Sequence, residues 1–199
     1  KYYLKYYLEY LYDLLDLILK KEVDSNFNFP INKNKEINLK KIFSKNRNYV
    51  GIAPGAGEKN KIWPLNNYIE IGKYLESKFY QIVFYLGPNE KEYEKVLKQN
   101  FKNAIFLENE ELLNSFSNIE IIMASTKFLK FAISNDSGVS HMLSTNCCPL
   151  IKLFGPKDSK KFTPKLKNLI TVSSSEVNSD KIEDISVKRI INAIEDINL

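Results

Sequence analysis

The sequence predicts an α/β fold in which a parallel sheet is covered by helices on both faces. Three observations predict this fold. From Tyr49 onward, short apolar runs of strand length alternate with amphipathic helical patterns, which is typical of βαβ units. Runs such as residues 131–133 are apolar throughout, as in strands that are buried on both faces. Several of these runs end in Gly, Pro, Asn or Asp, the residues that favour turns.

The first 48 residues precede this alternation. Residues 1–22 have apolar and Tyr side chains around most of a helical circumference, which indicates a helix that packs against another domain or a partner. A membrane-surface helix is the alternative. Because the chain starts at Lys1 inside this pattern, we expect a segment upstream. Residues 23–41 are rich in Asn, Lys and Pro and predict a connector with room for one edge strand.

We expect a domain boundary near residues 45–48. Residues 1–45 would then be the tail of a preceding domain and a connector, and residues 46–199 the α/β domain. Within it, the alternation predicts strands at residues 49–53, 81–86, 104–107, 131–133, 150–154 and 169–172. The helices between them are marked by Tyr68, Ile71, Leu75 and Phe79, by residues 90–98, by Phe116, Ile119, Ile122 and Met123, by Val139, Met142 and Leu143, and by residues 187–197.

Composition limits the classes of partner and compartment. Hydrophobic residues make up 44% of the 199 residues, enough for a core. The net charge is +5, but the basic residues are scattered lysines apart from Arg47 and Arg189, so no nucleic-acid partner is expected. Cys147 and Cys148 lack further ligands at metal-binding spacing and predict core thiols of a reducing compartment, the cytosol.

The turn after the strand at residues 131–133 carries the most chemistry. Asp136 is followed by Ser137, a candidate N-cap, and by Gly138, where a ligand could approach the backbone closely. The amides of the following helix favour an anion. His141, the single histidine, lies one helical turn from Ser137 on the same face. An ordinary strand-to-helix turn with a surface histidine fits the spacing equally well.

Two other predicted strand ends carry candidate residues. The small residues 54–57 permit close approach of a phosphate, with Lys61 as a nearby charge. Trp63 fits either a lid or the core, and the core is favoured. Glu90, in the first turn of a helix, fits simple complementarity to the helix dipole. If these ends share one edge of the sheet, they predict a pocket for a diphosphate joined to a polar organic group.

In this order, the motifs resemble glycosyltransferase family 9, the lipopolysaccharide heptosyltransferase family. The matching residues are Pro54-Gly55-Ala56, Lys61-Ile62-Trp63-Pro64, Gly87-Pro88-Asn89-Glu90, Asn135-Asp136-Ser137-Gly138 with His141, and Leu153-Phe154-Gly155-Pro156. The resemblance covers about residues 49–199 and implies the C-terminal, Rossmann-like half of a GT-B glycosyltransferase.

The resemblance implies inverting transfer of heptose from ADP-heptose to a lipid-linked oligosaccharide, the lipopolysaccharide core acceptor. Gly55, Ala56, Gly57 and Lys61 would hold the phosphates, and Glu90 the nucleoside. Asp136 would bind sugar hydroxyls, and Ser137, Gly138 and His141 the diphosphate and its surroundings. No metal or other cofactor is expected. The implied location is the cytoplasm, with possible peripheral contact with the inner membrane.

The sequence departs from the family pattern in two places. Many members carry Ser or Thr where Gly57 stands, so one phosphate contact is missing here. We expect residues 1–45 to match only the tail of the family's N-terminal acceptor domain, which carries the proposed base, so no catalytic residue is assigned in this chain. The chain alone should therefore transfer sugar poorly. A family member that uses another nucleotide sugar, and a non-catalytic nucleotide-binding module, are the alternatives.

Overall fold

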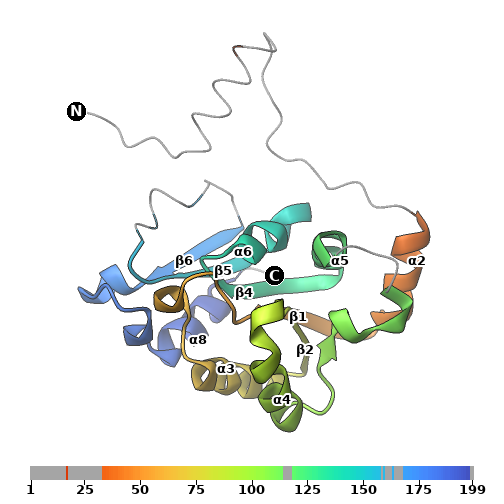
Figure 1. Ribbon diagram of the computed structural model, residues 1–199, viewed down its shortest axis with the longest axis horizontal. Helices are drawn as coiled ribbons and strands as arrows, with labels where there is room; N and C mark the ends of the chain where they lie inside the picture. Colours follow the sequence, from red (N-terminus) through yellow and green to blue (C-terminus); the bar gives the residue numbers. More distant parts are fainter. Residues whose placement is uncertain are drawn as a thin grey trace.

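Six parallel strands form one sheet at the centre of the molecule (Figure 1). The computed structural model describes residues 33–113, 118–157 and 168–197, together with Leu17, Ser159 and Thr163. The strands are β1 (Asn48–Ala53), β2 (Tyr80–Phe84), β3 (Ile105–Phe106), β4 (Leu129–Asn135), β5 (Leu150–Phe154) and β6 (Leu169–Ser173). Their order is β3-β2-β1-β4-β5-β6. The order reverses between β1 and β4, and in open α/β sheets such a reversal opens a crevice at the carboxyl ends of the strands.

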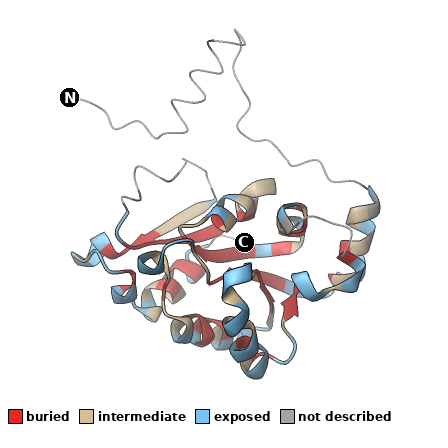
Figure 2. Ribbon diagram, in the orientation of Figure 1, coloured by how far each residue is buried: buried red, intermediate tan, exposed pale blue. Residues whose placement is uncertain are grey.

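Helices cover both faces of the sheet, as predicted. One apolar cluster gathers side chains of α3 (Leu65–Ser77), α4 (Lys91–Asn100) and α8 (Val187–Glu195). The other gathers side chains of α2 (Lys33–Ile42), α5 (Asn118–Ser125) and α6 (Gly138–Leu143). Figure 2 shows the buried residues concentrated on the strands and on the inner sides of the helices. In the described part of the chain, no helix is long and apolar enough to cross a bilayer.

The packing of α3 shows how the apolar pattern places a helix. Tyr68, Ile71 and Leu75 recur at helical spacing and are all buried. Gly72 lies on the same side, and a Cβ at this position would come within 2.5 Å of the Phe101 ring. The helix therefore approaches its neighbours through a glycine that leaves room for an aromatic ring, as close packing requires.

Three expectations about the elements are wrong. Residues 33–42, expected in a connector, form α2, whose Leu39 is buried in the second cluster. Because residues 23–41 are rich in Asn and Lys, their composition did not indicate the single apolar face of this helix that packs on the sheet. Phe79, expected on α3, lies beyond the helix end with a φ of 63° and is 91% exposed. Cys147, expected in the core, is exposed, whereas its neighbour Cys148 is buried. The chain turns between the two cysteines, since Cys147 has a φ of 57°.

The remaining strands and helices that were expected within the described residues are confirmed within a few residues at each end. The predicted helix at residues 1–22 lies outside the described residues, apart from Leu17. So do residues 23–32, where an edge strand was considered, and Phe116. The domain boundary near residues 45–48 stays a prediction.

Candidate functional site

The loops that follow β1 and β4 meet at the point where the strand order reverses, and Asn135 joins them. Its Nδ2 donates to the carbonyls of Pro54, at 2.7 Å, and of Gly55, at 3.4 Å. Its Oδ1 accepts from the Trp63 amide at 3.2 Å and from the Tyr68 hydroxyl at 2.9 Å. Asn135 has no exposed surface. This one side chain therefore fixes the start and the end of the loop from Pro54 to Trp63 relative to β4.

Asp136 lies between two lysines. Its Oδ1 is 2.7 Å from the Nζ of Lys152, and its Oδ2 is 3.7 Å from the Nζ of Lys61. The Asp136 amide donates to the carbonyl of Leu153 at 2.9 Å, which ties the turn to the end of β5. Lys61 is also 2.7 Å from an oxygen of Glu58, whose side chain is 52% exposed. The result is a chain of alternating charges that runs from solvent to the interior.

The turn after Asp136 leads into α6 as predicted, with Ser137 at the N-cap position. The Ser137 hydroxyl is buried, and among the described residues it has no hydrogen-bond partner. A Cβ at Gly138 would meet none of the described residues within 4 Å, so space is open beside the backbone there. His141 follows on α6 and is exposed. A buried hydroxyl without a partner carries a desolvation penalty that a bound acceptor would remove.

The loops after β1 and β2 meet at Glu90. A Cβ at Gly55 would come within 2.4 Å of the Glu90 carboxylate, so the carboxylate lies directly over that glycine. Glu90 also accepts a hydrogen bond from the Gly87 amide at 2.5 Å. Ala56 is half-buried, whereas Gly57 is exposed with nothing within 4 Å of a Cβ. The structure thus brings Glu90 to the Gly55 loop and leaves open space beside Gly57.

Electrostatics at this edge follow from burial and from the lysines. Burial lowers the pKa of His141, and Lys152 lowers it further, while Asp136 acts in the opposite direction. His141 is exposed overall, so water reduces these effects, but their direction favours the neutral imidazole at pH 7. The hydrogen bond with Glu58 raises the pKa of Lys61, and Asp136 adds to the increase. Lys61 therefore stays charged.

Two residues of the site were missed in the sequence. Asn135 stands in the family motif, but the sequence assigns it no role there, because composition does not show which carbonyls a turn residue binds. Lys152 was not singled out, although it stands among apolar residues in the strand Leu150–Phe154. A charged residue within a buried strand was the signal that could have found it. Trp63, in contrast, lies in the core as favoured, where its Nε1 donates to the carbonyl of Ile185 at 2.8 Å.

The loop after β5 contains Gly155 of the motif Leu153-Phe154-Gly155-Pro156 and packs against the turn that carries Lys61. A Cβ at Gly155 would come within 2.8 Å of the Ile182 Cβ and 3.1 Å of the Asn60 carbonyl oxygen. The Ser174 hydroxyl donates to the Gly155 carbonyl at 3.2 Å. This glycine therefore serves close packing of the short turn Lys59–Lys61, which carries Lys61.

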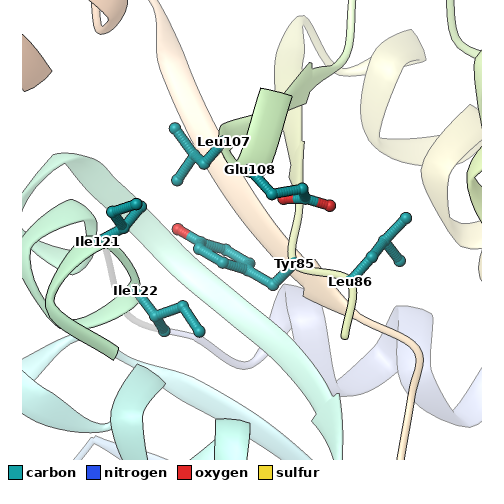
Figure 3. A pocket seen from close by; sticks show the side chains of 6 residues that line it. All are labelled: Tyr85, Leu86, Leu107, Glu108, Ile121 and Ile122. Atoms are coloured by element: carbon teal, nitrogen blue, oxygen red, sulfur yellow. The ribbon is translucent and has the colours of Figure 1, made fainter. Parts of the chain in front are cut away.

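A small cavity lies near the ends of β2 and β3 (Figure 3). Its volume is about 20 Å³, and its lining residues are Tyr85, Leu86, Leu107, Glu108, Ile121 and Ile122. It has room for roughly one water molecule. The cavity is therefore too small for a nucleobase. Burial raises the pKa of Glu108 to about 7, although hydrogen bonds with the main chain of Glu108 and Leu86 lower it. The residue as a whole is exposed, so water reduces this effect as well.

Among the described residues, no group of three or more His, Cys, Asp or Glu side chains is placed to hold a metal ion. The polar groups at this edge are instead two lysines, three carboxylates, one hydroxyl and one histidine: Lys61, Lys152, Glu58, Glu90, Asp136, Ser137 and His141. Lysine ammonium groups and hydroxyl donors bind phosphate oxygens, and a carboxylate accepts hydrogen bonds from sugar hydroxyls. The arrangement can therefore hold an anion beside a polyhydroxyl group.

Comparisons with known proteins indicate the family and the fold of the chain. The sequence model of glycosyltransferase family 9 (heptosyltransferase) matches residues 6–189. Lipopolysaccharide heptosyltransferase 1 of Campylobacter coli is 28% identical over 175 residues, which cover 86% of this chain and 50% of that protein. Lipopolysaccharide heptosyltransferase 2 of Escherichia coli (strain K12) is 30% identical over 128 residues, which cover 63% of this chain and 36% of that protein.

Solved structures share the fold. Escherichia coli heptosyltransferase WaaC with ADP superposes with a TM-score of 0.75 at 18% identity, over 98% of this chain and 57% of that chain. The glycosyl transferase family 9 structure from Veillonella parvula gives a TM-score of 0.74 at 18% identity, over 88% of this chain and 54% of that chain. The chain spans half or less of the length of the curated relatives described above.

Proposed function

Since the chain belongs to glycosyltransferase family 9 (heptosyltransferase), we propose that it supplies the donor-binding half of a heptosyltransferase. The reaction would be the inverting transfer of heptose from ADP-heptose to a lipopolysaccharide core acceptor. The observation that carries the proposal is Asp136 held between Lys61 and Lys152, beside open backbone at Gly57 and Gly138. These groups lie where the strand order reverses, the usual ligand position of such sheets.

Each group has a role in this proposal. Lys61 and the Ser137 hydroxyl bind the diphosphate, and Asp136 accepts hydrogen bonds from the heptose hydroxyls. A neutral His141 donates one N–H to the diphosphate. When the glycosidic bond breaks, negative charge develops on the leaving diphosphate, and the positive charge of Lys61 together with these donors stabilises it. Glu90, over the Gly55 loop, binds the nucleoside. No residue of this chain is assigned as the base that activates the acceptor.

The same groups would do the electrostatic work for which other transferases use a metal, so we expect binding to be independent of divalent cations. The acceptor would be a lipid-linked oligosaccharide, which would place the protein in the cytoplasm at the inner face of the membrane that holds the acceptor. Contact with that membrane would be peripheral.

The experiment is a calorimetric titration of the 199-residue chain with ADP, UDP and GDP, followed by ADP-heptose, with and without EDTA. We expect saturable binding of ADP, tighter binding of ADP-heptose, and no effect of EDTA. Preference for UDP or GDP would indicate a family member with another donor. No binding of any of these nucleotides by the folded chain would contradict the proposal, and so would efficient sugar transfer by this chain alone.

Gly57→Ser should improve donor binding. Open space faces Gly57, and none of the glycines has a positive φ, so a side chain fits without strain. A hydroxyl here would restore the phosphate contact that the family pattern implies. One net hydrogen bond contributes about 0.5–1.5 kcal/mol, and hence roughly 2- to 12-fold in ADP affinity. Gly57→Ala is the matched control and should leave the affinity unchanged. Equal affinities of the two variants would contradict the contact.

A further inference from the structure

Lys152 is the one charged side chain that is fully buried in the part of the chain that the structure describes. It occupies the middle of β5, where every residue from Leu150 to Phe154 is buried. Its side chain is 2% exposed, and its Nζ lies over the Phe154 ring, 4.9 Å from the ring centre. An ammonium group in such surroundings must be paired or lose its proton, because a lone buried charge is costly. Burial lowers the pKa of Lys152, and Asp136 acts in the opposite direction.

The pairing of Lys152 is specific. Among the described residues its ion-pair partner is Asp136, with 2.7 Å between Nζ and Oδ1. The register of the sheet explains the contact: Lys152 lies beside Ser134 of β4, and Asp136 follows that strand by one residue. The Ser134 hydroxyl is buried and has no hydrogen-bond partner within the part of the chain that the structure describes. The carboxylate is thus approached by Lys152 from inside the protein.

Lys61 reaches the same carboxylate from the loop after β1, but its position is looser. It is 3.7 Å from the second oxygen, Oδ2, and 2.7 Å from the exposed Glu58. Water reaches the Glu58 side of this ion pair, since the Glu58 side chain is 52% exposed, and weakens the attraction. Lys61 can therefore exchange Glu58 for another anion. The two lysines therefore differ: Lys152 is fixed on Asp136, whereas Lys61 can move.

Stability alone gives no reason for a lysine in this strand. Replacing a buried ion pair with apolar residues of similar volume is often neutral or stabilising. Removing only one partner is different, because the other charge is left without compensation. If Lys152 were absent, Asp136 would draw Lys61 to itself and would repel a nearby diphosphate.

We propose that Lys152 is a positioning residue of the donor site, which neutralises Asp136 from inside the protein and so leaves Lys61 free to bind the donor's diphosphate. This inference rests on the proposed function, because it assigns Lys61 to the diphosphate. It predicts that the effect of losing Lys152 on ADP binding depends on the charge of Asp136. If the lysine stem served only packing, the effect would not depend on that charge.

Four proteins test the proposal: the wild type, Lys152→Met, Asp136→Asn and the double variant. ADP is the ligand because it lacks the sugar and leaves the sugar contacts of Asp136 out of the comparison. We expect Lys152→Met to bind ADP at least about 10-fold more weakly, the scale of one charge-assisted hydrogen bond. Asp136→Asn, which leaves Lys152 without its carboxylate partner, is the reference for the double variant. The double variant should recover to within roughly 3-fold of Asp136→Asn.

Two results would overturn the proposal: unchanged ADP binding by Lys152→Met, or weak binding that Asp136→Asn does not rescue although the double variant is folded. Thermal unfolding of all four proteins shows whether each is folded. Because methionine has nearly the volume and shape of the lysine stem, the packing against Phe154 is kept.

A second readout needs no ligand. The chain has a single histidine, so one imidazole titration curve in an NMR spectrum belongs to His141. The charged groups that act on it are Lys152, which lowers its pKa, and Asp136, which raises it. Lys152→Met should therefore raise the pKa of His141, and Asp136→Asn should lower it. If the wild type binds no nucleotide, the proposed function fails. The His141 titration then still shows whether the charge of Lys152 acts at this edge of the sheet. An unchanged pKa of His141 in Lys152→Met would contradict that action.

Discussion

We expect Asn135→Ala to lower the free energy of unfolding by about 3–5 kcal/mol, because it breaks a buried hydrogen-bond network. The side chain bonds the Trp63 amide, the Tyr68 hydroxyl and the carbonyls of Pro54 and Gly55. Alanine would leave all of these groups buried without this partner. Urea denaturation followed by the fluorescence of Trp63, which lies in the core, measures the change.

Tyr68→Phe is the matched control for this network. It removes one hydrogen bond to Asn135 and keeps the ring in its buried position. We expect a loss of about 1 kcal/mol. A loss of less than about 1 kcal/mol in Asn135→Ala itself would mean that water replaces the missing amide, and that the loop from Pro54 to Trp63 is held by other contacts. ADP binding should fall with stability in Asn135→Ala, because this loop carries Lys61.

We expect Lys61→Met to weaken ADP binding roughly 10- to 150-fold, since hydrogen bonds to charged groups contribute about 1.5–3 kcal/mol. Lys61 stays charged, because Glu58 and Asp136 raise its pKa, and its Nζ lies at the edge where the proposed diphosphate binds. Stability should change little, because Glu58, its closest ion-pair partner, is 52% exposed and water weakens the pair. Titration calorimetry at constant ionic strength measures the affinity.

Lys59→Met is the control for Lys61, because Lys59 lies in the same short turn and is exposed. It should change ADP affinity less than about 2-fold, the scale of a screened surface charge. Equal losses in the two variants would indicate a general effect of positive charge on the loop. That result would contradict a specific phosphate contact of Lys61.

Local sequence determined the elements of the fold and part of the site. Apolar spacing in α3 and α8 and the apolar run of β5 are confirmed, since side-chain periodicity depends only on the local geometry of the chain. The turn that carries Asp136, Ser137 and Gly138 was also found, because turn residues and a following helix are contiguous in the sequence. Composition failed for α2, where apolar residues are few and its Leu39 becomes buried only through contact with the sheet.

The tertiary structure decided which of these residues meet. The strand order places β1 beside β4, and only this order brings Lys61 to Asp136. The register between β4 and β5 places Lys152 beneath the same carboxylate, which no local pattern encodes. Glu90 fitted a helix-dipole role from its position, yet it lies over Gly55 of another loop. Strand order and register arise from contacts between segments distant in sequence, so sequence patterns predicted the candidate groups but not their pairing.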